Sequence, residues 1–205
     1  MARAKSKVKS KSQSKSQGGN DALALLKADH KAVRKLFDQF DKMAGGEGDP
    51  EERHALATQI CAELTVHAQV EEEIFYPALR EALDDQALLD EAEVEHASAK
   101  DLIEQLESMT PEEELFDAKV TVLGEYIKHH VEEEEGEMFK AVGKGDLDLV
   151  ALGESMAARR EELREELGLD AEEGDEDEEV EEEEEESAED GEGSEKSRRG
   201  SRRTG

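Results

Sequence analysis

Apolar residues recur every three or four positions through most of the chain between residues 20 and 167. This spacing places them on one face of an α-helix. The pattern divides into five segments, and the predicted helices cover about residues 21–43, 50–78, 85–108, 111–142 and 146–167. No segment alternates apolar and polar residues in the way a half-buried strand does. The sequence therefore predicts an all-α fold.

Residues at the ends of these segments support the predicted boundaries. Asn20 or Asp21 can cap the first helix, because either side chain can accept a hydrogen bond from a free backbone N–H group. The sequence Thr110-Pro111-Glu112-Glu113 is a capping box with proline at the first helical position, and it predicts the start of the fourth helix. Pro77 is expected to kink or loosen the last turn of the second helix.

Four long helices with short connections predict an up-down-up-down four-helix bundle over residues 20–142. The fifth segment, within residues 143–167, has fewer apolar residues on its inner face. We therefore expect it to form an accessory helix that packs on the outside of the bundle.

Both ends of the chain have a different composition from its middle. Residues 1–19 are rich in lysine and serine, with six basic residues and no acid, and residues 168–205 are rich in glutamate. Neither stretch holds enough apolar residues to offset the entropy lost on ordering, so both are predicted to be disordered tails. The tails could recruit a protein partner.

Charge and cysteine content narrow the possible partners and location. The net charge of −31 argues against specific binding of nucleic acid, because contacts with phosphate supply most of that affinity, but it favours attraction of cations. Cys61 is the single cysteine, so no disulfide framework is expected. The sequence shows no signal peptide and no apolar run of membrane-spanning length. The expected location is the cytoplasm, with no membrane partner.

Polar residues interrupt the apolar faces at six positions. A histidine precedes a glutamate by four residues in two helices, so each pair shares one helix face. Single histidines occupy the apolar faces of the other two helices. The six residues are His30, His67, Glu71, His96, His130 and Glu134.

Burial of these six groups would be costly unless they had partners. Few lysines or arginines share the same helix faces, so neutralisation by ion pairs is not expected. A pair of divalent metal ions would satisfy all six, and imidazole with carboxylate suits iron, manganese or zinc. The order of histidine before glutamate, at a spacing of four, excludes the standard ferritin-like arrangement.

A single histidine on an apolar face is more often a hydrogen-bonded core residue than a ligand, but four histidines with two paired glutamates favour metal. His54 is expected at the surface, and His129 is expected to be exposed or to support the site from outside. Cys61 is expected to be a small buried residue. The glutamate runs 71–73 and 132–135 are expected to be mostly solvated apart from the two ligands.

The order of these histidines and glutamates resembles the hemerythrin-like HHE cation-binding domain family. Their flanks, LLKADHKAVRKLF, HAQVEEEIFYPAL and YIKHHVEEEEGEMF, are similar to it as well, and the resemblance covers residues 20–142. It implies a non-heme di-iron centre that binds O2, with Glu71 and Glu134 as bridging carboxylates. One iron would take His30 and His67, and the other would take His96 and His130. The aromatic residue nine positions after each histidine selects His130 over His129 as the ligand.

The sequence departs from the oxygen-carrying hemerythrins at two positions. Lys100 stands where those proteins have a further histidine, and Glu134 stands where they have aspartate. One fewer histidine implies an additional open position for water, O2 or peroxide. This difference favours a redox-reactive or sensing site over reversible O2 storage.

Three kinds of function remain open. The first is a di-iron protein that binds O2, peroxide or nitric oxide and senses or handles oxygen, redox state or iron. The second is a di-iron enzyme with ferroxidase or peroxide-removing activity. The third is an acidic interaction module in which the metal is structural and the charged tails recruit partners.

Overall fold

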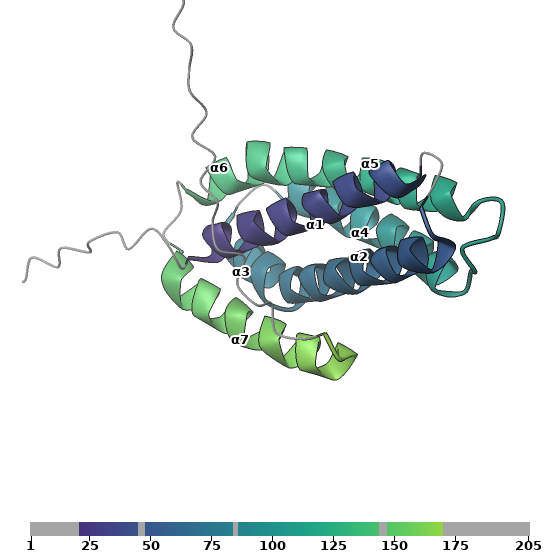
Figure 1. The fold of residues 1–205 in the computed structure, drawn as a ribbon. Coiled ribbons are helices and arrows are strands. Elements are labelled where there is room, and N and C mark those ends of the chain that lie inside the picture. Colours follow the sequence, from purple (N-terminus) through teal and green to yellow (C-terminus); the bar gives the residue numbers. More distant parts are fainter. Residues whose placement is uncertain (1–20, 45–47, 84–85, 144–146, 170–205) are drawn as a thin grey trace, which may run out of the picture. The chain divides into compact units, whose positions relative to one another are not determined.

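The computed structural model describes residues 21–44, 48–83, 86–143 and 147–169, and these ranges contain helices and turns but no strand. Four helices lie alongside one another (Figure 1): α1 (Ala22–Ala44), α2 (Pro50–Val70), α4 (Ala87–Glu107) and α5 (Phe116–Glu133). α1 and α4 each pack against both α2 and α5. The predicted four-helix bundle is confirmed.

Two of the long helices continue through a widened, π-helical turn. α2 passes through η1 (Glu71–Phe75) into α3 (Tyr76–Ala82), and α5 passes through η2 (Glu134–Met138) into α6 (Phe139–Val142). The backbone N–H of Tyr76 donates to the carbonyl of Glu71, five residues earlier, and Phe139 donates to Glu134 in the same way. Each turn therefore holds one residue more than an α-helical turn.

The widened turns shift which residues face the core. An uninterrupted α-helix would place Ile74 and Ala78 inside, but both are only partly buried, whereas Phe75, Tyr76 and Leu79 are buried. The α-helical spacing of apolar residues, which would place Ile74 and Ala78 inside, therefore does not hold beyond Glu71.

Proline alone does not explain the widening. Pro77 lies in the first turn of α3, just after η1, where its missing N–H group is tolerated. The second widened turn, Glu134–Met138, contains no proline. What the two turns share is a buried glutamate at the first position.

The fourth predicted helix begins later than expected. The Glu113 carboxylate accepts a hydrogen bond from the Thr110 N–H group at 2.9 Å, which is half of the predicted capping box. However, the Glu113 N–H group donates to the Thr110 carbonyl and closes a turn, and helix α5 starts only at Phe116. The prediction of a helix from Pro111 was therefore wrong by about one turn.

The predicted accessory helix is α7 (Leu149–Leu167), which packs along α1 and α2 outside the four-helix bundle (Figure 1). The Asp148 carboxylate accepts a hydrogen bond from the Ala151 N–H group and caps its start. Gly168 ends the helix with φ 68°, a left-handed conformation that favours glycine. The predicted tails, 1–19 and almost all of 168–205, lie outside the described residues.

Buried apolar residues form two clusters, one towards each end of the bundle. One cluster includes Leu26, Phe75 and Met156, and the other includes Ile60 and Phe116. Buried polar side chains from all four long helices lie between the two clusters, so the bundle has a polar layer across its middle. None of the helices in the described ranges combines the length and apolarity needed to cross a bilayer.

Candidate metal centre

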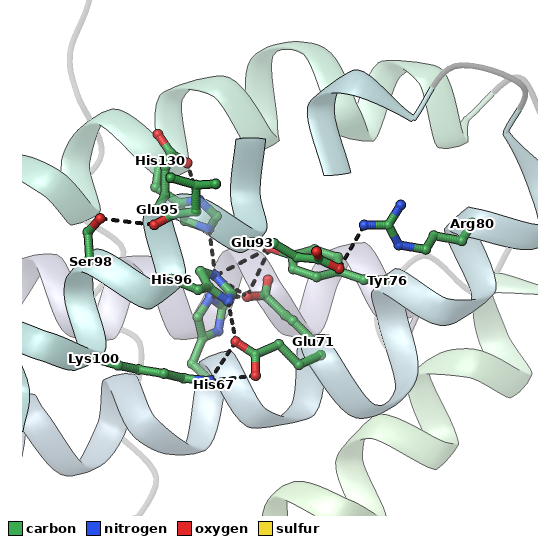
Figure 2. Close-up of polar contacts among 12 residues, drawn as sticks. His67, Glu71, Tyr76, Arg80, Glu93, Glu95, His96, Ser98, Lys100 and His130 are labelled. Carbon is green, nitrogen blue, oxygen red and sulfur yellow. Dashed lines mark hydrogen bonds and ion pairs between the residues drawn. The ribbon is translucent and has the colours of Figure 1, made fainter. Parts of the chain in front are cut away.

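All six predicted ligand residues lie in this polar layer, and none is more than 7% exposed. α1, α2 and α4 each supply one histidine, α5 supplies the fourth, and the two glutamates begin the widened turns. Figure 2 shows part of this group, with Glu71, His67, His96 and His130 turned toward one another. We refer to the six together as the centre: His30, His67, Glu71, His96, His130 and Glu134.

The histidines of the centre form two facing pairs. The ring centroids of His30 and His67 are 4.9 Å apart, and those of His96 and His130 are 4.8 Å apart. One oxygen of Glu71, Oε2, lies 3.4 Å from His67 Nε2 and 3.3 Å from His96 Nε2. Glu71 thus contacts one member of each pair, the geometry that a bridging carboxylate requires.

Two sets of ligand atoms in the centre each fit around a single ion. His30, His67, Glu71 and Glu134 form one set, and Glu71, His96 and His130 form the other, with all ligand atoms of a set within 4.8 Å of one another. Nitrogen and oxygen ligands at about 2.0–2.2 Å from an ion lie up to about 4.4 Å apart, close to this limit. The sets share Glu71, as two adjacent ions would require.

The hydrogen bonding of the centre is incomplete without a cation. Six buried atoms of the centre have no hydrogen-bond partner: His30 Nε2, both ring nitrogens of His67, Glu71 Oε1 and both carboxylate oxygens of Glu134. Of these, His30 Nε2 and Glu134 Oε2 lie 3.2 Å apart as an ion pair. Leaving such groups unsatisfied is costly, and the cost is larger for charged groups. Lone pairs of nitrogen and oxygen that converge in a buried layer fit a divalent cation.

Three further carboxylates hold the outer nitrogens of the histidines. His30 Nδ1 donates to Glu135 at 2.8 Å, His96 Nδ1 donates to Glu72 at 3.0 Å, and His130 Nδ1 donates to Glu95 at 2.8 Å. A proton on Nδ1 leaves the Nε2 lone pair free to face the centre, and such pairs orient metal-binding histidines in proteins.

Sequence reasoning missed these three carboxylates as functional residues. Glu72 and Glu135 belong to runs that were expected to be solvated, and each directly follows a glutamate that was predicted to be a ligand. Glu95 directly precedes His96. Their position next to a predicted ligand was the signal that could have identified them.

The fourth histidine is held differently. Asp29 directly precedes His30, as Glu95 precedes His96, but its carboxylate lies 3.7 Å from His67 Nδ1, too far for a hydrogen bond. The same carboxylate pairs with Arg160 of α7. Through Arg160, α7 therefore contacts a residue beside the centre, and His67 Nδ1 has no hydrogen-bond partner of the kind that the other three histidines have.

Tyr76 is a further buried residue at the centre that sequence reasoning used only as an alignment marker. Its hydroxyl lies 3.4 Å from Glu71 Oε2 and 3.3 Å from His96 Nε2 (Figure 2). The widened turn brings Tyr76 onto the face that Glu71 occupies. Phe139 has the equivalent position after Glu134, and its ring stacks on His30 with centroids 6.2 Å apart.

Burial and nearby charges raise the pKa values of some acidic groups in and beside the centre and lower those of others. Burial, together with the nearby charge of Glu134, raises the pKa of Glu71 well above its usual range. Burial also acts to raise the pKa of Glu134, but the contact with His30 and the charges of His30, His130 and His67 together outweigh burial and lower the pKa. The hydrogen bond from His96 and the charge of Lys100 lower the pKa of Glu72 to about 2. Burial and the charge of Glu71 raise the pKa of Tyr76, which keeps its hydroxyl protonated as a donor.

A small cavity of about 30 Å³ adjoins the centre. All four histidines line it together with mostly apolar side chains, among them Val33, Leu64 and Ile103. Lys100 also lines it, and the Lys100 ammonium donates to Glu72 at 2.7 Å. A protonated ammonium has no lone pair, so Lys100 does not replace the histidine that oxygen-carrying hemerythrins have at this position.

The remaining candidates lie apart from the centre. His129 is 62% exposed on the surface of α5, and half-buried His54 stacks against Phe116. Cys61 is buried in an apolar cluster, as expected, and burial and the charge of Glu107 raise its pKa to about 12. None of the three offers an atom to the centre.

Comparison with known proteins identifies a matching family over the bundle. The family described as "Hemerythrin HHE cation binding domain" matches residues 21–142. A solved structure, a hemerythrin HHE cation binding domain-containing protein of Mycobacterium kansasii, matches with a TM-score of 0.58 and 30% sequence identity. The match covers 71% of this chain and 88% of that structure.

Curated relatives add two further similarities. An uncharacterized protein of Mycobacterium tuberculosis is 29% identical over 150 residues, which is 70% of this chain and 88% of that protein. A protein described as a DNA nickase from a Nostoc strain is 31% identical over 121 residues, or 58% of this chain. The chain spans only 32% of the length of that relative, which extends well beyond the shared region.

Proposed function

Because the chain belongs to the hemerythrin HHE cation-binding family, we propose that its centre holds two iron ions and binds O2 or a related small oxidant, such as peroxide or nitric oxide. His30 and His67 would hold one ion, and His96 and His130 would hold the other. Glu71 and Glu134 would lie between them. The protein would then sense or handle oxygen, redox state or iron.

The observation that carries this proposal is the set of buried nitrogen and oxygen atoms without hydrogen-bond partners at the middle of the bundle. A purely structural polar layer would be expected to satisfy its own hydrogen bonds. Imidazole and carboxylate ligands suit iron, with manganese or zinc as alternatives. The carboxylates behind three of the histidines would keep the Nε2 atoms oriented toward the ions.

The size of the adjoining cavity supports a small ligand. A volume of about 30 Å³ exceeds the roughly 10–15 Å³ that one water molecule needs, so a diatomic molecule can be accommodated. Bound iron would supply redox chemistry and an open coordination position. The apolar walls would exclude larger and charged molecules, and the Tyr76 hydroxyl would hold Glu71 by a hydrogen bond.

Metal content of anaerobically purified protein, with an optical spectrum after Fe(II) loading and exposure to air, tests the proposal. We expect two irons per chain and the absorption of an oxo-bridged pair. His67→Ala or Glu71→Ala should lose iron, whereas His54→Ala, which changes a histidine outside the centre, should keep it. Unchanged iron content in the first two variants, or a folded wild-type protein that binds no metal, would refute the assignment.

A second candidate function is enzymatic, namely ferroxidase or peroxide-removing activity. The ion pair between Lys100 and Glu72 favours it, because a lysine in that pair does not occupy a coordination position and leaves it to a substrate. Turnover of peroxide or Fe(II) by the iron-loaded protein would support this function. Binding without turnover would support sensing.

A further inference from the structure

A second group of metal-ligand side chains lies on the surface beside the centre. Glu95 of α4 with His129 and Glu133 of α5 place ligand atoms within 4.8 Å of one another, and we call these three residues the outer cluster. His129 Nε2 lies 3.7 Å from Glu95 Oε1 and 3.5 Å from Glu133 Oε1. The side chains of His129, Glu133 and Glu95 are 62%, 33% and 21% exposed, so the cluster opens to solvent.

The geometry and chemistry of the outer cluster suit a divalent transition-metal ion. Ligands at about 2.1 Å from one ion are separated by about 3.0–4.2 Å, and both of these distances fall in that range. One imidazole and two carboxylates suit Fe(II), Mn(II), Co(II) or Zn(II). Because the cluster is exposed, water can complete the coordination, which is typical of weak and exchangeable binding.

Glu95 connects the outer cluster with the centre. Its Oε1 atom faces His129, whereas its Oε2 atom accepts the hydrogen bond from His130 Nδ1 at 2.8 Å. Figure 2 shows Glu95 directly beside His130. One carboxylate thus contacts an exposed histidine on one side and a histidine of the centre on the other.

A narrow cavity follows the same route. Its volume is about 10 Å³, roughly that of one water-sized sphere. Glu95 and Glu133 line it together with His130 and Glu134 of the centre. Both carboxylate oxygens of Glu134 are buried without a hydrogen-bond partner, and Glu134 is 1% exposed. The cavity is therefore lined both by two residues of the outer cluster and by a buried carboxylate of the centre.

We propose that the outer cluster is a loading site, which captures a hydrated divalent transition-metal ion and passes it through this cavity to Glu134. The inference rests on the proposed function, because it requires a metal centre at the end of the cavity. A surface helix pair would account for His129 with Glu133 alone. It accounts neither for the contact of Glu95 with both histidines nor for the cavity that ends at Glu134.

The test uses Co(II), whose visible absorption reports its ligands, with the full-length metal-free protein under anaerobic conditions. Equilibrium titration gives the number of ions bound, and stopped-flow absorption gives the rate at which the centre fills. The variants are His129→Ala and Glu133→Gln. The matched control is Glu132→Gln, which removes the same charge one residue away, from an exposed side chain outside the outer cluster.

We expect the wild type to bind two Co(II) ions tightly and a third more weakly. His129→Ala and Glu133→Gln should keep the two tight ions, lose the third and fill the centre about tenfold more slowly at low Co(II), because local capture raises the concentration of ions at the entrance. Glu132→Gln should fill at the wild-type rate.

The possible failures are distinguishable. Two tight ions in every variant, with equal filling rates for Glu133→Gln and the wild type, would overturn the loading site and leave the proposed function intact. Equal slowing by Glu132→Gln and Glu133→Gln would also overturn it, since general surface charge would then suffice. A wild-type protein without two tight ions would refute the proposed function, and the loading site with it.

Discussion

Replacement of Glu71 by methionine should stabilise the protein in the absence of metal while abolishing its response to metal. Glu71 is fully buried, its Oε1 atom has no hydrogen-bond partner, and burial raises its pKa. Methionine has a similar length without branching and carries no charge. Glu71→Met therefore removes a buried carboxylate with one unsatisfied oxygen, and it also removes the residue that the two sets of candidate ligands share.

The size of the effect follows from the environment of Glu71. Replacing a whole buried ion pair or triad by apolar residues of similar volume is neutral or stabilises proteins by about 1–4 kcal/mol, and the hydrogen bond that Glu71→Met removes, from the Tyr76 hydroxyl at 3.4 Å, is a long one. A domain of this length gains about 2–4 °C in Tm for each kcal/mol, so Glu71→Met should raise the Tm of the metal-free protein by about 2–16 °C. Free metal at a thousand times its Kd would stabilise the wild type by about 4 kcal/mol but should not affect the variant.

Thermal unfolding followed by far-ultraviolet circular dichroism, in a chelator and with anaerobic Fe(II), measures both effects. Leu123→Met is the matched control, because Leu123 is fully buried in the cluster of Ile60 and Phe116, where a methionine changes little volume. It should cost less than about 1.5 kcal/mol and keep the metal response. If Glu71→Met melted below the wild type in chelator, the carboxylate would already be satisfied without metal and the reasoning would be wrong.

Three further predictions test other parts of the structure. Lys100→His should slow air oxidation of the iron-loaded protein, since an added imidazole would fill a position otherwise open to O2; an unchanged oxidation rate would count against this. Glu135→Gln should weaken binding of the ion at His30 by about tenfold or more, because it removes the carboxylate that orients this histidine. Asp29→Asn should weaken binding at His67 less, because the Asp29 carboxylate lies 3.7 Å from His67 Nδ1. Co(II) titration measures the affinity of both variants, and equal losses would contradict the prediction. The native Cys61 thiol should react with Ellman's reagent at pH 8 no faster than the chain unfolds, because burial raises its pKa from 9.0 to about 12. Because the folded protein raises this pKa, the stability that protonated Cys61 contributes is fully present below pH 9.0 and is lost as the pH rises toward 12. Comparison of the free energies of unfolding of wild type and Cys61→Ala across this pH range would measure the loss.

The bundle could be predicted because its apolar spacing is regular over four long segments. The prediction failed where the backbone leaves the α-helical repeat. Residues before Glu71 have the same pattern whether an α or a π turn follows, and only the burial of Phe75 and Tyr76 in place of Ile74 reveals the difference. The start of α5 was missed because the Thr110 turn satisfies the same hydrogen bonds that would begin a helix.

Some residues of the centre were also predictable from the regular spacing of apolar residues, because they interrupt it. His30 and His96 were identifiable because each interrupts an apolar helix face. Glu72, Glu95 and Glu135, which hold the outer nitrogens, have no periodic signal that separates them from the other acidic residues, and only their position next to a predicted ligand distinguishes them in the sequence. In the structure they are identified by their hydrogen bonds to histidines of other helices, and the sequence pattern of a single helix does not contain this information.

The widened turns also bear on how the chain can change in evolution. A residue deleted from Glu71–Phe75 would restore α-helical spacing and move Phe75 and Leu79 to positions 74 and 78, which face the core in an uninterrupted helix. A residue deleted from the α-helical part of the same helix would instead rotate everything beyond it by about 100° and turn core residues outward. Among relatives, single-residue deletions in these helices should therefore fall within the two widened turns more often than elsewhere.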